Sequence, residues 1–298
     1  MHFWKRTYYK TIGRWLFGKN IKELAKFLGE SAETLARTDP RYHSFSMPKR
    51  SGGTRQIQAP QPALKKLQRK VLRRIFGRLR SHPSVTGFEK HHSIVTNART
   101  HVGADVVVRM DIQDFFPSTS SERLYQYFRN IGWNRKAANL LVNLCTLDGA
   151  LPQGAPTSPR LSNLVNYQMD ARLAGLANSL GAVYTRYADD ITFSFCDDNH
   201  AAISTAIRYT KKILADYGYR LHHKKKLHIR RTHQRQEVTG LVVNEQVALP
   251  RTRRRWLRAV EHRLANGENA SISPEQFAGW RALQNMIEIQ SRTDNDTK

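Results

Sequence analysis

Apolar residues along this chain follow two kinds of pattern, helical spacing and short β-rich runs. Helical spacing dominates residues 64–79, 121–147 and 159–178, whereas the runs 106–111 and 184–195 are rich in β-branched and aromatic residues. Because these strands alternate with helices, we expect an α+β or α/β core in the middle of the chain.

Both ends of the chain predict further helices. Two short helical patterns, IKELAKFLGE and SAETLAR, resemble a helix-turn-helix near the start. Near the end, a hairpin-like run (EVTGLVVNEQVALP) precedes an Arg-rich helix from about residue 252. A last helix is announced by Ser273, Pro274 and Gln276 in the N-cap, N1 and N3 positions, so a small helical appendage should close the chain.

Charge adds a class of partner to this picture. The 298 residues include 49 Lys plus Arg and 24 Asp plus Glu, for a formal charge of +25, which favours binding to a polyanion. The charge is concentrated, since residues 49–80 hold eleven Lys or Arg and no acid, and residues 201–260 hold fifteen against three acids. We therefore expect two basic surfaces.

The first basic surface coincides with the helical pattern of residues 64–79. Its cations fill the positions between the apolar ones, and those we assign to nucleic-acid binding are Lys65, Lys66, Arg69, Lys70 and Arg73. An ordinary solvated face is the alternative, but such faces mix charges of both signs. The absence of any acid favours phosphate binding.

Other composition signals argue against secretion and membrane insertion. No stretch approaches the roughly 18 apolar residues of a membrane span, and the first twenty residues interleave aromatics with bases instead of forming a signal peptide. Cys145 and Cys196 lie far apart and in no CxxC pair, which argues against a zinc knuckle and against a disulfide framework. A cytoplasmic location is the expectation.

The first chemical signal is the segment VVVRMDIQDFFPS. A strand of the buried type runs directly into Asp111. An Asp at a strand end is often only a turn residue or a helix cap, so this carboxylate indicates catalysis only if it has a partner.

The segment TRYADDITFSF supplies that partner. Residues 184–187 and 191–195 predict two strands, with Ala188, Asp189 and Asp190 as the tight turn between them. Adjacent carboxylates repel each other unless a cation compensates, and their oxygens suit Mg²⁺. If the strand that ends at Asp111 lies beside this hairpin, three carboxylates converge, as two-metal phosphoryl transfer requires.

A third segment, LPQGAPTSPRLSNLVNYQMD, combines a Gly/Pro-rich loop with a helix. Such a loop can present backbone N–H groups and Gln153 to a base or a sugar. A plain connection between helices is the alternative, because Gly and Pro are common in any loop.

Together these motifs resemble the bacterial retron reverse transcriptases. The matching segments run from about residue 49 to 250 and include RQIQAP, GFEKHHSIVTNARTHVG, MDIQDFFPS, LPQGAPTSP, RYADD, HHKKKLHI and VTGLVV. The resemblance implies an α+β right-hand polymerase with fingers, palm, short thumb and a helical N-terminal extension. It implies an extension in 1–48, fingers in 49–105, palm with inserted fingers helices in 106–245 and a thumb or RNA-recognition region in 246–298.

The same resemblance implies a metal-dependent site. Asp111, Asp189 and Asp190 match the catalytic acidic triad of the family, with the Ile112 carbonyl as an additional ligand of two Mg²⁺ ions. The residue chemistry and the family pattern therefore indicate the same carboxylates.

Residues for the incoming dNTP follow from the resemblance in the same way. Phe116 matches an aromatic that lies under the sugar and excludes a 2′-OH, Gln153 matches a nucleotide contact, and Arg55 matches a residue near the triphosphate. Either Lys224 or Lys225 matches a lysine that can protonate pyrophosphate.

The second basic surface falls in the region that matches the RNA-recognition thumb of retron relatives. Its candidate RNA contacts are Arg251, Arg253, Arg254, Arg255, Trp256 and Arg258. Trp256 could stack on a base, or it could pack in the core of an ordinary basic helix.

The resemblance also implies partners. These are a cognate retron noncoding RNA (msr-msd) that primes from a guanosine 2′-OH, the branched RNA-linked DNA product (msDNA), and a separate effector in antiphage defence. Only 58 residues follow Gly240, too few for an RNase H domain, so a host RNase H is expected to remove RNA. The alternatives are a group II intron-like or diversity-generating reverse transcriptase and a noncatalytic RNA chaperone, although a chaperone gains nothing from three acids facing a polyanion.

Overall fold

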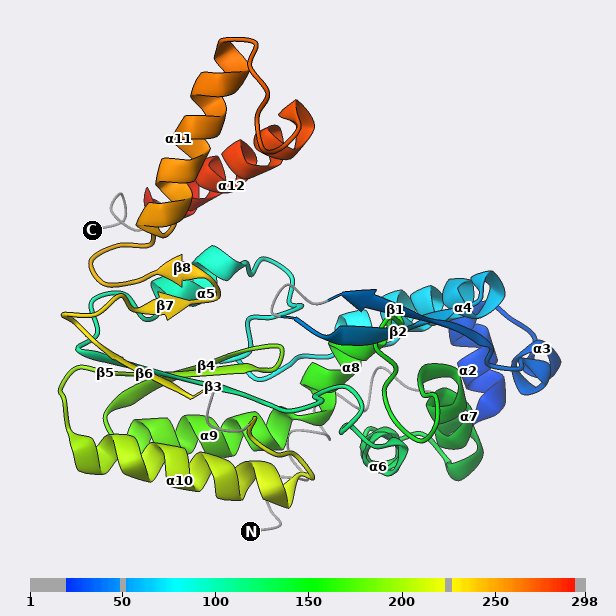
Figure 1. Ribbon diagram of the computed structural model, residues 1–298. Coiled ribbons are helices and arrows are strands. Elements are labelled where there is room, and N and C mark those ends of the chain that lie inside the picture. Colours follow the sequence, from blue (N-terminus) through cyan, green and yellow to red (C-terminus); the bar gives the residue numbers. More distant parts are fainter. Residues whose placement is uncertain (1–19, 49–51, 223–226, 293–298) are drawn as a thin grey trace. The chain divides into compact units, whose positions relative to one another are not determined.

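The computed structural model describes residues 20–48, 52–222 and 227–292 (Figure 1). The chain divides into two compact units. The first unit comprises Met1–His82, Gln113–Met169 and Asp216–Tyr219, and the second comprises Pro83–Ile112, Asp170–Ala215 and Arg220–Lys298. Each unit is therefore assembled from segments that are distant in the sequence.

The first unit is mainly helical. Its helices are α2 (Ile21–Leu28), α3 (Ala32–Arg37), α4 (Pro62–Arg74), α6 (Ser121–Asn130), α7 (Arg135–Cys145) and α8 (Ser158–Val165). An antiparallel hairpin of β1 (Tyr42–Pro48) and β2 (Thr54–Pro60) completes it. Leu24 and Leu35 are buried in the same core as Leu64 of α4, so the helix pair near the start uses its apolar faces for packing within this unit.

A four-stranded antiparallel sheet forms the centre of the second unit, with the strand order β4-β5-β3-β6. Its strands are β3 (Val106–Asp111), β4 (Ala182–Tyr187), β5 (Asp190–Phe195) and β6 (His228–Arg231). Figure 1 shows α9 (Tyr167–Ser179) and α10 (His200–Asp216) running along one face of this sheet. This arrangement confirms the expected α+β core.

Other described elements of the second unit form a separate hydrophobic cluster. It contains α5 (Ile94–Arg99), the short hairpin of β7 (Glu237–Val238) and β8 (Leu241–Val242), and helices α11 (Arg251–Ala265) and α12 (Pro274–Arg292). Val107 of β3 joins this cluster, which anchors it to the sheet. The hydroxyl of Thr239 at the tip of the hairpin also donates to the Ile94 carbonyl at 2.9 Å.

Most predicted helices form close to their expected positions. The last helix begins as expected, because the Ser273 hydroxyl accepts from the Gln276 N–H at 3.3 Å and the Gln276 side chain accepts from the Ser273 N–H at 3.1 Å. The pattern over 121–147 is split into α6 and α7, since Gly132 takes a φ of 108° between them. Within the described part of the chain, no helix is long and apolar enough to cross a bilayer.

Candidate active site

Three carboxylate residues lie at the ends of adjacent strands in the second unit. Asp111 is the last residue of β3, and its partner in the antiparallel register is Asp190, the first residue of β5. Asp189 directly precedes Asp190, and its carbonyl oxygen accepts a hydrogen bond from the Ile112 N–H at 2.9 Å. Backbone pairing alone therefore brings the three predicted acids and Ile112 to one end of the sheet.

The turn between β4 and β5 is shorter than the sequence pattern predicts. That pattern places Ala188, Asp189 and Asp190 in the turn, whereas Asp190 already belongs to β5 and pairs with Tyr187. Only Ala188 and Asp189 form the turn, and Ala188 adopts a φ of 57°. A positive φ lets a two-residue turn match the twist of its strands, which is why the hairpin closes one residue earlier.

Arg109 offsets part of the negative charge at this end of the sheet. It lies two residues before Asp111 on β3, so both side chains are on the same face. Its Nη2 atom is 3.8 Å from Oδ1 of Asp190, and both side chains are only partly exposed. Partial burial lessens solvent screening of the attraction between them.

The donor set fits a hard divalent cation. Carboxylate and carbonyl oxygens are the ligands that Mg²⁺ prefers, and Asp111, Asp189, Asp190 and Ile112 supply them from adjacent backbone positions. Among the described residues, no group of three or more His, Cys, Asp or Glu side chains is already arranged to hold a metal ion. The fit is therefore one of donor type and backbone position.

Three predicted nucleotide contacts belong to the first unit. The Gln153 carbonyl accepts from the Gln58 N–H of β2 at 2.8 Å, so the LPQG loop is paired with this strand. Gly154 has a φ of 132°, and a Cβ there would lie 2.8 Å from the Gln58 carbonyl oxygen, so only glycine permits this approach. Arg55 is exposed on β2, and Phe116 is partly buried against the core of this unit.

Lys224 and Lys225 lie outside the described residues. The structure therefore does not choose between them as the lysine for pyrophosphate.

Comparison with known proteins identifies the family. Residues 47–244 match the family model for reverse transcriptase (RNA-dependent DNA polymerase). Over 281 residues the chain is 35% identical to the Retron Ec86 reverse transcriptase of Escherichia coli, covering 92% of this chain and 86% of that relative. The chain belongs to the retron reverse transcriptases. It is accordingly an RNA-directed DNA polymerase.

Other relatives agree with this assignment. This chain is 35% identical to the Retron Mx162 reverse transcriptase of Myxococcus xanthus, and the match covers 90% of this chain but 64% of that longer relative. A solved structure of telomerase from Candida albicans, in complex with a fragment of telomeric RNA, has a TM-score of 0.51 at 12% identity, covering 76% of this chain and 48% of the other. The structural likeness confirms the right-hand polymerase fold, whereas the division into four regions stays a prediction.

Residues 97–101 (NARTH), part of the matching segment GFEKHHSIVTNARTHVG, have a structural role in the second unit. Asn97 Oδ1 accepts from the Thr86 hydroxyl at 2.7 Å. His101 bridges side chains of two neighbouring strands, with Nδ1 2.7 Å from the Ser194 hydroxyl of β5 and Nε2 2.7 Å from the Thr185 hydroxyl of β4. Burial lowers the pKa of His101 to about 3, so the ring is neutral at physiological pH. The neutral ring of His101 therefore stabilises the sheet by bonding to both strands.

The cationic face of α4 forms as expected, with one exception. The side chains of Lys65, Lys66, Arg69 and Arg73 are exposed. Lys70 instead forms an ion pair with Glu30 in the same unit, and both side chains are largely buried. Four of the five predicted cations thus present their charge to solvent, and Lys70 shares its charge with an acid.

Helix α11 carries the second predicted basic surface. The five arginines predicted to contact RNA, Arg251, Arg253, Arg254, Arg255 and Arg258, are exposed. Trp256 is partly buried, packs edge-on against Trp280 of α12 and donates from Nε1 to the Ser271 hydroxyl at 3.1 Å. The Arg253 guanidinium covers both rings, 5.0 Å and 4.7 Å from their centroids. These contacts favour the core interpretation of Trp256.

The sequence reasoning did not identify a basic pocket on the same face of the sheet as Asp111. The pocket has a volume of about 360 Å³ and is lined by Val107, Arg109, His228, Arg230, Arg235 and Glu237. Arg109 and His228 are register partners on β3 and β6. The Arg109 Nε atom is buried and has no hydrogen-bond partner among the described residues.

Electrostatics in this pocket favour an anion. Burial, and then the charges of Arg109 and Arg230, lower the pKa of His228. In the sequence HIRR, the basic residues His228 and Arg230 are two positions apart, so a strand places them on one face. Together with Arg109 on the strand that ends at Asp111, this spacing is the sequence signal that could have located the pocket.

Proposed function

We propose that this polymerase copies one dedicated structured RNA, the noncoding RNA of its own retron. Synthesis starts from a guanosine 2′-OH of that RNA and produces branched RNA-linked single-stranded DNA. The observation that carries the proposal is the register pair of Asp111 and Asp190 beside Asp189, in a chain whose relatives are retron reverse transcriptases. The net charge of +25 suits a partner with many phosphates.

Asp111, Asp189 and Asp190, together with the Ile112 carbonyl, would hold two Mg²⁺ ions. When bound, the ions would activate the attacking hydroxyl and stabilise the charge on the leaving pyrophosphate. Arg109 limits the mutual repulsion of the acids through its contact with Asp190. The protein's own contribution is to hold the carboxylates at adjacent strand ends before substrate binds.

Residues of the first unit, with a lysine outside the described residues, serve the incoming dNTP. Phe116 would exclude a ribose 2′-OH by contact with the sugar, Gln153 would contact the nucleotide, and Arg55 would approach the triphosphate. Lys224 or Lys225 would donate a proton to pyrophosphate. Pairing of the LPQG loop with β2 supports this role, because it gives Gln153 a defined backbone position.

Nucleic-acid strands bind through the basic surfaces. We assign the exposed cations of α4 and α11 to phosphate contacts with the RNA, and the basic pocket beside Arg109 to one backbone phosphate of a bound strand. Arg109 and Arg230 line this volume of about 360 Å³, while Arg235 is paired with Glu237 at 2.9 Å, so two arginine charges remain to attract a phosphate.

The cellular setting follows from the retron assignment. The enzyme would act in the cytoplasm, a host RNase H would remove template RNA, and a separate effector protein would use the product in antiphage defence. These partners are inferred from the family and not from any surface of this chain.

The test combines the protein with its co-expressed upstream RNA, Mg²⁺ and labelled dNTPs, and compares wild type with Asp189→Asn. DNA covalently joined to RNA in wild type, and absent in the variant, is the expected result. Extension of an annealed primer only would leave the polymerase but remove the 2′-OH priming. RNA binding without any synthesis would replace the proposal with a chaperone function.

A further inference from the structure

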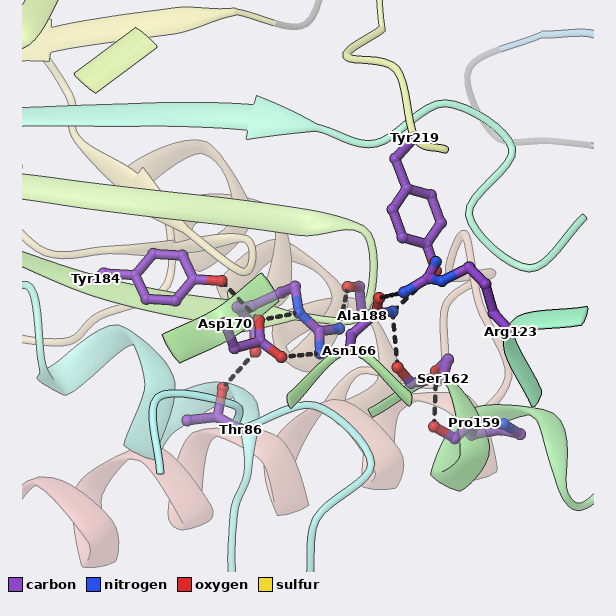
Figure 2. Close-up of polar contacts among 10 residues, drawn as sticks. Thr86, Arg123, Pro159, Ser162, Asn166, Asp170, Tyr184, Ala188 and Tyr219 are labelled. Carbon is purple, nitrogen blue, oxygen red and sulfur yellow. Dashed lines mark hydrogen bonds and ion pairs between the residues drawn. The ribbon is translucent and has the colours of Figure 1, made fainter. Parts of the chain in front are cut away.

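A fully buried ion pair lies behind the turn that carries Asp189. Arg186 of β4 and Asp170 of α9 each have 0% exposed side-chain surface. The guanidinium is bidentate, with Nε 2.7 Å from Oδ1 and Nη2 2.8 Å from Oδ2 of Asp170 (Figure 2). Because a buried ion pair adds little net stability, its presence at this position points to a role in fixing geometry.

The third guanidinium nitrogen of Arg186 reaches the turn itself. Its Nη1 atom donates to the Ala188 carbonyl at 2.9 Å, as Figure 2 shows. That carbonyl belongs to the peptide bond that joins Ala188 to Asp189. Ala188 has a φ of 57°, a conformation that costs energy for a residue with a Cβ. Arg186 therefore stabilises an unfavourable turn next to a catalytic carboxylate.

The backbone around this turn is held as well. The Arg186 N–H donates to the Ser84 carbonyl at 2.9 Å, and the Arg186 carbonyl accepts from the Thr86 N–H at 3.0 Å. A Cβ on Gly87 would lie 2.6 Å from the Ala188 nitrogen, so the two backbone segments are in close contact. Held by the guanidinium and by residues 84–87, the turn has little freedom to move.

Tyr184 adds one hydrogen bond to the ion pair without contacting the turn. Its hydroxyl donates to Asp170 Oδ1 at 2.8 Å. Burial, followed by the Asp170 charge, raises the pKa of Tyr184 well above its usual value, so the hydroxyl keeps its proton. Tyr184 therefore provides a matched control, because its loss removes one hydrogen bond to Asp170 but leaves both the bidentate contact and the bond to Ala188.

We propose that Arg186 and Asp170 form a positioning pair that fixes the Ala188–Asp189 turn, and with it the carboxylate of Asp189, in the geometry that nucleotide addition requires. Because both side chains are fully buried, the pair acts through the Ala188 carbonyl and not by touching substrate itself. The inference rests on the polymerase activity and is independent of how the retron primes synthesis.

The test measures single-nucleotide addition to an annealed RNA template and DNA primer by wild type, Arg186→Lys and Tyr184→Phe. Lysine keeps a positive charge opposite Asp170, but it cannot make the bidentate contact and also reach the Ala188 carbonyl. For Arg186→Lys we expect the rate of addition to fall on the order of 10- to 100-fold. The Mg²⁺ concentration for half-maximal rate should rise several-fold, while the dNTP KM and RNA affinity stay as in wild type.

Tyr184→Phe should keep the rate within about threefold of wild type and keep its Mg²⁺ midpoint. Thermal unfolding of each variant separates positioning from folding. A normal rate and Mg²⁺ midpoint in Arg186→Lys would overturn the proposal, as would equal losses in both variants that follow their thermal stability. If wild type were inactive on this annealed substrate, the polymerase assignment itself would be overturned. If wild type extended the annealed primer but made no DNA on the structured RNA, only the proposed 2′-OH priming would be overturned.

Discussion

At the scale of single residues, the three acids are expected to tolerate no neutral replacement. Asp111→Asn and Asp189→Asn remove one negative charge from the proposed metal ligands, and each should lower DNA synthesis by roughly 10³-fold or more. RNA affinity should change little, because binding depends on cations elsewhere in the chain. Primer extension and filter binding on the same samples measure the two effects.

Asp197→Asn is the matched control for this experiment, because Asp197 is an exposed acid two residues beyond the end of β5. It should retain wild-type synthesis. If Asp189→Asn were as active as Asp197→Asn, Asp189 would not be a catalytic ligand.

His101 provides a residue-scale prediction about pH. The pKa of His101 is about 3 in the folded chain, against an ordinary value of 6.5 in the unfolded chain. Below pH 6.5 the unfolded chain therefore binds a proton that the folded chain does not. Its contribution to the free energy of unfolding is therefore complete above pH 6.5 and declines as the pH falls toward 3. The slope for one proton is at most about 1.4 kcal/mol per pH unit.

Urea unfolding between pH 7.5 and 4.5 tests this expectation. His101→Gln should be less stable than wild type at pH 7.5, because the bonds to Ser194 and Thr185 are disturbed, but its stability should fall less steeply with acid. His43→Gln, at an exposed site on β1, should keep the wild-type slope. Parallel curves for His101→Gln and wild type would contradict the buried neutral ring.

Sequence reasoning predicted the acids but not the residues that hold them. Asp111 and Asp189 are recognisable because Asp111 ends β3 and Asp189 lies in the turn after β4, and that pattern is local. Arg186 forms its ion pair with a residue on another element, and His101 bonds Ser194, 93 positions away. A partner of this kind is chosen by tertiary packing, which no local pattern encodes.

At the scale of secondary-structure elements, the positions of helices and strands were more predictable from the sequence than the partners of individual side chains. The caps of α12 and the strands around the acids formed where hydrogen-bonding and apolar patterns required them. The exception was Asp190, which the pattern placed in the turn. Its place in β5 depends on pairing with Asp111, on a strand about 80 residues earlier in the chain.

Helix α4 gives a prediction at this scale, because four of its predicted phosphate contacts are exposed and one is paired. A combined Lys65→Gln, Lys66→Gln, Arg69→Gln variant should bind RNA more weakly. The slope of log affinity against log salt concentration should become shallower by about 0.7 to 0.9 for each phosphate that the variant no longer neutralises. Binding titrations at several salt concentrations measure it.

Lys70→Gln supplies the comparison on the same helix. Since Lys70 pairs with Glu30, its loss should lower the free energy of unfolding. The salt slope of RNA binding should change little. If the combined variant left the slope unchanged, the exposed face of α4 would be an ordinary solvated surface and would not contact phosphates.

For the whole molecule, composition predicted the class of partner, whereas the division into two interleaved units was not predictable. The excess of 25 positive charges is a property of the sequence and requires no knowledge of the fold. The boundary after Ile112 falls inside the run VVVRMDIQDFF, which carries no linker composition. Which segments pack together is decided by burial between distant parts of the chain, so the units could be located only in the structure.

The whole-molecule charge also separates RNA binding from synthesis. Because binding is attributed to Lys and Arg and synthesis to the three acids with Mg²⁺, removal of divalent ions with EDTA should abolish DNA synthesis and leave most RNA affinity in place. Potassium should be held at a constant concentration so that the RNA keeps its fold and the screening length does not change. Restoring Mg²⁺ should restore synthesis in wild type but not in Asp189→Asn. Synthesis that persisted in EDTA would rule out the metal site at Asp111, Asp189 and Asp190. Loss of binding in EDTA would mean that the RNA is held through divalent ions and not by the protein's cations.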